Sequence, residues 1–232
     1  MLLELGGNAA LIVHGDWHDL DEAALRTAHA AFGFAGQSCI SVQRVFVERK
    51  IFQTFLWKVV EHKAKLVAGN PSDEATEVGP LIRLSEAERV DAWVKEAVQG
   101  GAKLVAGGDR HGSVVTPAIL TGTTPGMKVR DEEVFGPVVA IEPYDDFEQA
   151  LADVNHSKYG LQAGLLTRDA GRILTAYREL EVGSLIVGDT PSWRLDPMPF
   201  GGVKDSGLGR EGIRSAIQEM TEPRMLVMAG IS

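Results

Sequence analysis

The sequence is organised around one stretch, FGFAGQSCIS at residues 32–41, which holds the only cysteine of the 232-residue chain. Small residues frame Cys39, and the β-branched residues that follow predict a strand over 42–47. A thiol in a glycine-rich turn is accessible, and neighbouring backbone N–H groups can point at a developing negative charge. The competing interpretation is a buried, inert cysteine, because free cysteines are among the most buried residues.

A carboxylate near the start of the chain favours the reactive interpretation. Glu4 stands in the stretch Leu3-Glu4-Leu5-Gly6-Gly7, beside two glycines. A thiol that can become a thiolate and a carboxylate that can take a proton from water are the groups needed for covalent acyl chemistry.

Composition excludes several classes of partner. With 23 basic and 32 acidic residues the formal net charge is −9, which argues against nucleic acid or an anionic membrane surface as partner. A single cysteine excludes an intramolecular disulfide and suits a reducing compartment. No apolar run approaches the roughly 20 residues that span a bilayer, and no signal-peptide pattern is present. We therefore expect a cytoplasmic protein.

Strands and helices alternate along the chain. Apolar runs predict strands over 9–13, 42–47, 138–141, 161–166 and 184–187. An alanine-rich helix is predicted to open near Asp19. This alternation predicts an α/β fold with a mainly parallel sheet flanked by helices.

Two further patterns concern element boundaries. Ser85-Glu86-Ala87-Glu88 is a capping-box pattern, which predicts the start of a helix that runs through Val98. The apolar tail 224–228 predicts a strand. No inter-domain linker is evident, so we expect one domain over 1–232, with 221–232 as a C-terminal strand or tail that serves oligomerisation.

The order of several motifs resembles the aldehyde dehydrogenase superfamily. The box around Glu4 is similar to the general-base motif of that family, and Gly36-Gln37-Ser38-Cys39 is similar to its nucleophile motif. Further matches follow in the family's order: Gly79-Pro80-Leu81-Ile82, Glu132-Glu133-Val134-Phe135-Gly136-Pro137-Val138, Asn155 with Tyr159-Gly160-Leu161, and Pro199-Phe200-Gly201-Gly202-Val203-Lys204-Asp205-Ser206-Gly207. Together they span essentially the whole chain.

The resemblance implies a function for individual residues. It implies NAD(P)-dependent oxidation of a small-molecule aldehyde to a carboxylic acid, with Cys39 as nucleophile and Glu4 as general base. Glu133 and Phe135 resemble residues that contact the nicotinamide ribose, and the carbonyl of Leu5 is expected to contact the carboxamide. Trp193 and Phe200 are expected to line the substrate entrance.

The resemblance also implies what this chain lacks. In the family a cofactor-binding domain precedes the Glu-Leu-Gly-Gly box, so we expect the catalytic half alone, which by itself does not bind NAD or NADP well and has little or no NAD-dependent activity. We further expect a homo-oligomer, built either through strand addition by the tail 224–228, which resembles the C-terminal strand of the family, or through the face around Glu4 and Cys39. Two other functions stay open: a hydrolase of esters or thioesters that needs no cofactor, and a non-catalytic assembly piece.

Three patterns have a plainer interpretation than their chemistry suggests. Gly207-Leu208-Gly209-Arg210-Glu211-Gly212 matches G-x-G-x-x-G, but no strand precedes it, so we interpret it as a turn into a helix. His14 and His18 stand four apart without a third ligand, which favours solvated loop histidines, and no metal site is predicted. Arg194 is expected at the surface or in an internal ion pair rather than on an anionic substrate.

Overall fold

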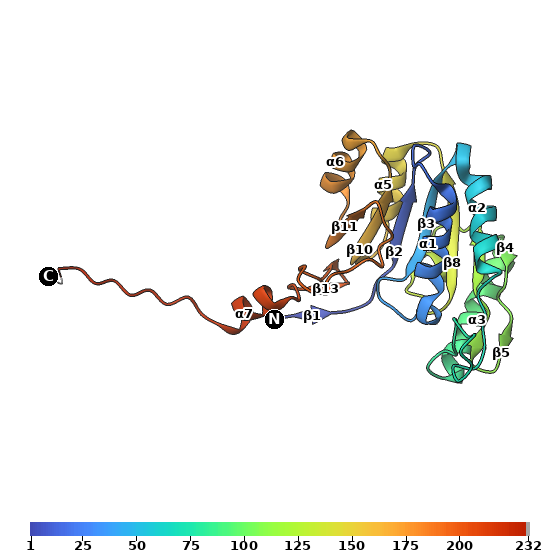
Figure 1. The fold of residues 1–232 in the computed structure, drawn as a ribbon, viewed down its shortest axis with the longest axis horizontal. Coiled ribbons are helices and arrows are strands. Elements are labelled where there is room, and N and C mark those ends of the chain that lie inside the picture. Colours follow the sequence, from blue (N-terminus) through green and yellow to red (C-terminus); the bar gives the residue numbers. More distant parts are fainter. Residues whose placement is uncertain (231–232) are drawn as a thin grey trace.

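The computed structural model describes residues 1–230 and has a seven-stranded central sheet (Figure 1). Neighbouring strands are parallel except at one edge, where the last strand is antiparallel. The order across the sheet is β11 (Ser184–Val187), β10 (Gln162–Leu166), β2 (Ala9–Val13), β3 (Val42–Glu48), β8 (Val138–Tyr144), β7 (Ala118–Thr121) and β4 (Lys103–Ala106). The predicted α/β fold with a mainly parallel sheet is confirmed.

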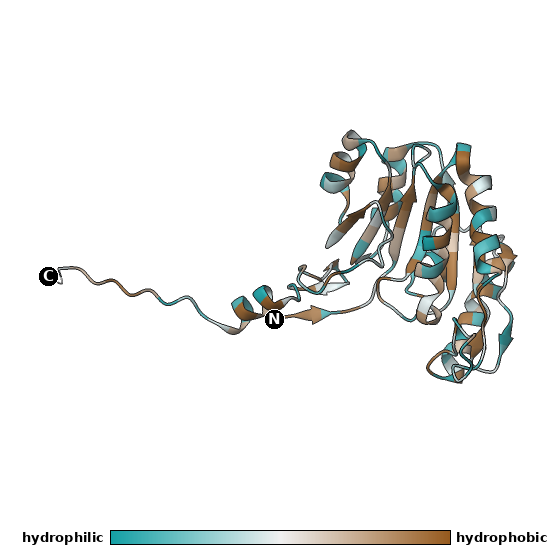
Figure 2. Cartoon of the chain, viewed as in Figure 1, coloured by the Kyte–Doolittle hydropathy of each residue, from teal (hydrophilic) through white to brown (hydrophobic). Residues whose placement is uncertain are grey.

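Helices cover both faces of the sheet because the strands alternate their side chains between two apolar cores. Leu11 and Val13 of β2 point to one face, where they pack with α1 (Leu20–Phe32), α2 (Arg49–Lys63) and α3 (Leu84–Gln99). Ala10 and Ile12 point to the other face, toward α5 (Phe147–Asn155) and α6 (Ala170–Glu179). Figure 2 shows the resulting pattern, with apolar strands inside and polar outer faces on the helices.

The remaining elements are short. They are β1 (Leu3–Glu4), the 3₁₀ turn η1 (Gly33–Gly36), β5 (Arg110–His111), β6 (Val114–Val115), α4 (Lys128–Asp131), β9 (Tyr159–Gly160), β12 (Val203–Lys204), β13 (Gly207–Leu208) and α7 (Ile213–Met220). β1 pairs antiparallel with β13, and β12 with β9. Within the Gly207–Gly212 stretch, the first two residues therefore form β13, which pairs with β1, and the rest lead into α7. None of the helices described for residues 1–230 is long and apolar enough to cross a bilayer.

Helix boundaries follow the sequence in one case and depart from it in another. The Asp19 carboxylate accepts hydrogen bonds from the N–H groups of Asp21 and Glu22, so the predicted start of α1 is confirmed. The capping box predicted at residues 85–88 is wrong. Helix α3 begins at Leu84, its N-cap is Arg83 and no side chain caps it, which leaves Ser85 inside the first turn.

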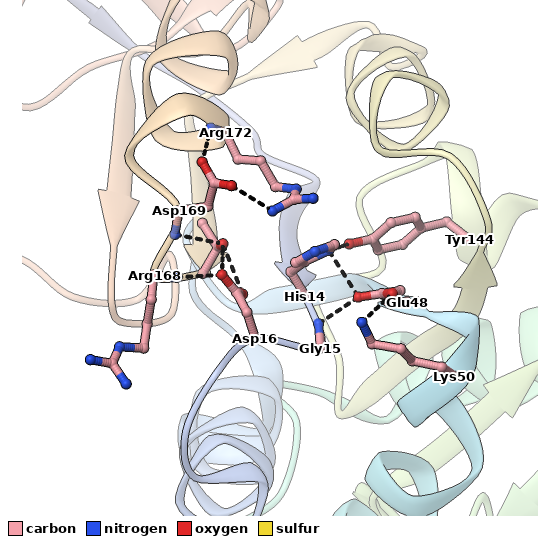
Figure 3. A network of polar contacts seen from close by, with 10 residues as sticks. His14, Gly15, Asp16, Glu48, Lys50, Tyr144, Arg168, Asp169 and Arg172 are labelled. Atoms are coloured by element: carbon pink, nitrogen blue, oxygen red, sulfur yellow. Dashed lines mark hydrogen bonds and ion pairs between the residues drawn. The ribbon is translucent and has the colours of Figure 1, made fainter.

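The predicted solvent exposure of His14 is also wrong. Its side chain is buried, and Nδ1 lies 2.8 Å from the Tyr144 hydroxyl and 3.0 Å from a Glu48 carboxylate oxygen (Figure 3). β2, β3 and β8 are parallel neighbours, so the residues that end them meet at one edge of the sheet. A hollow of about 530 Å³ opens there, at the carboxyl edge.

The predicted strand at 224–228 is wrong within the described residues. Residues 221–230 form no strand and run away from the body of the molecule (Figure 1). An extended segment becomes a strand only when its N–H and C=O groups find a neighbouring edge, and no segment of residues 1–230 offers one to this tail. The last two residues of the predicted 221–232 tail lie outside the described residues.

Candidate active site

Three motifs meet because each directly precedes the amino end of one of three neighbouring parallel strands. The Glu4–Gly7 box precedes β2, the Cys39 loop precedes β3, and the loop 132–137 precedes β8. Parallel strands align their amino ends, so segments far apart in sequence are brought to one edge of the sheet. This edge lies opposite the hollow at His14.

The cysteine loop has an unusual backbone. Phe34 and Ala35 both adopt left-handed conformations, with φ of 52° and 55°, inside the 3₁₀ turn η1. Each such non-glycine residue costs roughly 1–2 kcal/mol, so surrounding contacts must hold the turn in place. The amide of Gln37 supplies one such contact, because its Oε1 accepts the N–H of Ile82 at 2.9 Å.

Hydroxyl groups fasten the other side of this loop to α1. Ser41 donates to the carbonyls of Ala30 and Ala31, at 3.1 and 3.2 Å. These carbonyls belong to the last turn of the helix, where no intrahelical donor is available. The turn and the two bonds together fix Cys39 between the end of α1 and the start of β3.

The Glu4–Gly7 box touches the cysteine loop through backbone. An added Cβ on Gly7 would lie 2.1 Å from the Cys39 carbonyl oxygen, which only glycine permits. Upstream, the Leu5 N–H donates to the Ser206 carbonyl at 3.1 Å, and β13 pairs with β1. The segment that carries Glu4 is therefore fixed from both sides, although the Glu4 side chain remains exposed.

The electrostatics of the thiol reflect this arrangement. Burial, and then the charge and hydrogen bond of the Glu4 carboxylate, raise the pKa of Cys39 to about 12. Cys39 is half-buried, and the charge of Glu133 acts in the same direction. At neutral pH the thiol is therefore protonated, and Glu4 is the group in place to accept its proton.

The backbone N–H of Cys39 can serve an anion. Among residues 1–230 this N–H donates no hydrogen bond to a backbone carbonyl. A backbone donor beside a nucleophile is what a tetrahedral oxyanion requires.

The loop 132–137 presents Glu133 toward the box. Buried amides hold the loop: Asn8 donates to the Arg130 and Glu132 carbonyls, and Gln43 accepts the Val134 N–H at 3.0 Å. Glu133 Oε1 accepts the Gly7 N–H at 2.7 Å, whereas Oε2 accepts no hydrogen bond from residues 1–230. Burial raises the pKa of Glu133, and the Gly7 bond opposes that rise.

The loop after β11 reaches the same edge. Ser192 donates to the Ile40 carbonyl at 2.8 Å, which places its neighbour Trp193, 42% exposed, beside the cysteine loop. Phe200 is buried, and the Arg194 guanidinium lies 4.1 Å from its ring centroid. Phe200 thus differs from the predicted entrance wall, because Arg194, itself paired with Glu211 at 3.1 Å, covers it.

The structure brings together most residues singled out from the sequence. Cys39, Glu4, Leu5, Glu133 and Trp193 lie at one edge, and Phe135, 41% exposed, follows Glu133 by two residues. Sequence reasoning missed the buried amides Asn8, Gln43 and Gln162, which carry no charge pattern or motif. A polar side chain inside an apolar strand was the available signal for Gln162.

Comparison with known proteins gives a consistent result. A sequence model described as "Aldehyde dehydrogenase family" matches residues 1–226. The 3-sulfolactaldehyde dehydrogenase of Priestia aryabhattai is 54% identical over 226 residues, covering 97% of this chain and 47% of that protein. The lactaldehyde dehydrogenase of Methanococcus vannielii is 45% identical, over 97% of this chain and 48% of its own length. The chain spans about half the length of the curated relatives it matches.

Solved structures match over the same portion. Aldehyde dehydrogenase 21 from Physcomitrella patens, in complex with the reaction product succinate, superposes with a TM-score of 0.95 at 41% identity. The match covers 98% of this chain and 47% of that one. Glyceraldehyde-3-phosphate dehydrogenase GapN from Methanocaldococcus jannaschii, complexed with NADP, gives a TM-score of 0.90 at 39% identity, covering 94% and 47% of the two chains.

Proposed function

This chain belongs to the aldehyde dehydrogenase family, and from that premise we propose that it carries the catalytic half of an enzyme that oxidises a small aldehyde to a carboxylic acid with NAD or NADP. One observation carries the proposal. A half-buried thiol, Cys39, lies close enough to the Glu4 carboxylate for that charge to raise the thiol pKa, and the Cys39 N–H donates no hydrogen bond to a backbone carbonyl among residues 1–230.

The first step is addition of the thiol to the aldehyde. The sulfur of Cys39 forms a bond to the carbonyl carbon while its proton passes to Glu4, and the carbonyl oxygen becomes an oxyanion. The Cys39 N–H donates to that oxyanion, a contribution worth roughly 10²–10³ in rate for a single donor. Because the pKa of the thiol is about 12, proton removal must accompany attack rather than precede it.

The second half of the reaction is hydrolysis. After oxidation the acyl group is held as a thioester on Cys39, and Glu4 releases to solvent the proton that it took from the thiol. The Glu4 carboxylate then takes a proton from a water that attacks the thioester. The carboxylic acid leaves and Cys39 regains its proton. A positioned general base contributes roughly 10²–10⁴ in rate, and the backbone contacts of the Glu4–Gly7 box supply the positioning.

The residues present fit the nicotinamide end of the cofactor. The half-buried Glu133 has an Oε2 that accepts no hydrogen bond from residues 1–230, as a ribose hydroxyl requires, and Phe135, 41% exposed, follows it by two residues. Leu5 adjoins them in the box. NAD(P)⁺ bound there supplies the hydride acceptor, while these side chains would hold and orient it. Relatives of known structure include proteins complexed with NADP and with NAD⁺.

The substrate we propose is a short polar aldehyde. Relatives act, by their names, on sulfolactaldehyde and lactaldehyde, which carry a hydroxyl beside the aldehyde carbon. Trp193 is the exposed wall available to such a molecule. Arg194 does not serve as an anion ligand in this arrangement, because Glu211 already pairs with it.

The experiment uses the uniqueness of Cys39, which makes every thiol modification assignable to one atom. We expect p-nitrophenyl acetate to acetylate Cys39 in the wild-type chain and to leave Cys39→Ala unmodified, as read by mass spectrometry. Glu4→Gln removes the base for both steps, but at pH 9 its lower thiol pKa supplies thiolate for acylation, so the acetyl form should accumulate there because deacylation slows by roughly 10²-fold or more. Glu4→Gln should also lower the pKa of the thiol, so that iodoacetamide alkylates it faster at pH 9. Equal product formation by Cys39→Ala would refute the role of Cys39.

A hydrolase that needs no cofactor is the second candidate. The observation that favours it is that Cys39, Glu4 and the oxyanion donor all lie within this chain, whereas only the nicotinamide end of a cofactor site does. Single-turnover acylation of Glu4→Gln separates the two functions. In a dehydrogenase, acyl-Cys39 forms from lactaldehyde only when NAD(P)⁺ is added. Acylation by esters with no acylation by any aldehyde, at NAD(P)⁺ concentrations where binding to the chain is measured directly, would instead support the hydrolase.

A further inference from the structure

The loop 188–193 is fastened to β10 and α1 by a series of side-chain and backbone bonds. At its start, the Gly188 N–H donates to the Leu165 carbonyl at 2.9 Å. Arg26 of α1 then donates to the Gly188 carbonyl and to the Asp189 carboxylate, at 3.2 and 3.1 Å. These contacts fix the loop where it leaves the carboxyl end of β11.

Near its end the loop depends on one buried side chain. Gln162, at the amino end of β10, is 2% exposed, and its amide nitrogen lies 2.6 Å from the Pro191 carbonyl oxygen and 3.5 Å from that of Trp193. The two carbonyls on either side of Ser192 thus converge on one amide group. Only a side chain with two N–H donors, such as that of glutamine, can serve both.

Ser192 links this anchor to the nucleophile loop. Its hydroxyl lies 2.8 Å from the carbonyl oxygen of Ile40, the residue after Cys39, and 3.5 Å from that of Ala30. The loop is therefore held by Gln162 on one side and by the cysteine loop on the other. The backbone of Trp193, the next residue, is therefore held close to the cysteine loop, and its side chain is 42% exposed.

The other end of the Gln162 amide has no partner. Its Oε1 is buried and accepts no hydrogen bond from residues 1–230. A buried acceptor without a donor destabilises the folded state, so an apolar side chain of similar volume would avoid that penalty. A glutamine at position 162 is therefore better explained by the two loop carbonyls that its nitrogen binds than by any stabilisation of the core.

We propose that Gln162 is a positioning residue that determines which acyl groups the site accepts, by holding Pro191, Ser192 and Trp193 at a fixed distance from Cys39. The inference rests on the proposed role of Cys39 as nucleophile. Without the amide, the backbone that carries Trp193 is no longer fixed beside the cysteine loop, and the site discriminates less between small and bulky acyl groups.

The test measures a ratio rather than a rate. The quantity is the rate at which p-nitrophenyl acetate acylates Cys39, divided by the rate for p-nitrophenyl benzoate, in the full 232-residue chain. We expect Gln162→Leu and Ser192→Ala to change this ratio by about tenfold, within the range that pocket contacts confer. Ser192→Thr keeps the hydroxyl and should retain the wild-type ratio. Gln53→Leu, the same change at an exposed position of α2, is the matched control.

Hydrogen exchange gives a second readout that needs no activity. In Gln162→Leu the amides of 190–194 should exchange at least about tenfold faster, while those of β2 and β3 stay protected. An unchanged ratio together with unchanged exchange would overturn the inference. So would an equal fall of both acylation rates, which indicates a general structural role.

The two proposals fail differently. If wild-type Cys39 is not acylated by either ester, the proposed function fails, and the exchange measurement still decides whether Gln162 holds the loop. If Gln162→Leu does not fold, Ser192→Ala and Ser192→Thr make the same comparison from the other anchor.

Discussion

At the scale of single residues, the site depends on backbone atoms that lie close together. Gly7 meets the Cys39 carbonyl, and an added Cβ on Gly36, with φ of 69°, would lie 2.1 Å from the Gly136 carbonyl oxygen. The motifs are therefore rich in glycine because they pack against one another without side chains between them. Sequence reasoning grouped these motifs by resemblance, but it could not show that they touch through backbone.

Substitution of Gly7 tests this contact. Gly7→Ala places a methyl group 2.1 Å from a carbonyl oxygen, so either the box or the cysteine loop must shift. We expect a loss of roughly 1–3 kcal/mol in the free energy of unfolding, as overpacking costs. We also expect a thiol pKa nearer the usual value, because displacement separates Cys39 from Glu4. Urea unfolding and the pH dependence of alkylation measure the two effects.

Gly33→Ala is the matched control for that experiment. Gly33 lies in the cysteine loop that Gly7 touches, has φ of −54°, and an added Cβ on it would meet nothing within 4 Å. Its substitution should leave both the stability and the thiol pKa close to wild type. If Gly7→Ala and Gly33→Ala had the same stability and the same thiol pKa, the close approach of Gly7 to Cys39 would not determine either property.

At the scale of elements, the sequence predicted which segments form strands but not which strands are neighbours. The five predicted strands 9–13, 42–47, 138–141, 161–166 and 184–187 all appear in the sheet, because each is a short apolar run between turns. The adjacency of β2, β3 and β8 depends on long-range pairing that no local pattern encodes. That adjacency buries His14, which local reasoning placed in solvent.

Burial of His14 predicts a pH dependence of stability. Desolvation lowers the pKa of His14 below its usual 6.5, and Glu48 and Asp16 oppose the shift while Arg172 and Lys50 support it (Figure 3). The unfolded chain therefore binds this proton more tightly than the folded one. The resulting stabilisation is fully present above about pH 6.5 and is lost as the pH falls through the lower pKa of the folded state.

Replacing the imidazole removes this dependence. Between pH 7.5 and 5, wild type should lose more unfolding free energy than His14→Gln, and the difference in slope cannot exceed about 1.4 kcal/mol per pH unit for one proton. Urea denaturation across this range provides the measurement. His18→Gln, at an exposed neighbour, should follow wild type. Parallel curves for wild type and His14→Gln would show that His14 titrates alike in both states.

At the scale of the whole molecule, one end of the chain leaves apolar surface uncovered. Helix α7 has no buried residue, and beyond it Met225, Leu226, Val227 and Met228 are 63–85% exposed (Figures 1 and 2). At one edge of the sheet, Val187 of β11 is 42% exposed, and only β10 pairs with this strand within residues 1–230. Local hydrophobicity predicted a strand in the tail, but strand formation also needs a paired edge, and within residues 1–230 the tail has none.

Self-association follows from this exposure. An apolar extended segment and an open sheet edge are complementary, since strand addition satisfies the backbone groups of both. We therefore expect a homodimer or larger assembly at micromolar concentration, in which the tail of one copy covers apolar surface of another. The net charge of −9 opposes this only weakly at physiological salt, where charges are screened beyond about 8 Å.

Sedimentation velocity of matched variants tests the assembly. Wild type should sediment above the 25.0 kDa of one chain, and deletion of residues 223–232 should shift it toward that mass. Leu226→Asp with Val227→Asp should act like the deletion, because two carboxylates cannot be buried in an apolar strand contact without large desolvation costs. Tyr177→Asp, at a 74% exposed position of α6, controls for added charge alone. A wild-type chain that stays monomeric at every concentration would show that the exposed tail has no partner in a second copy.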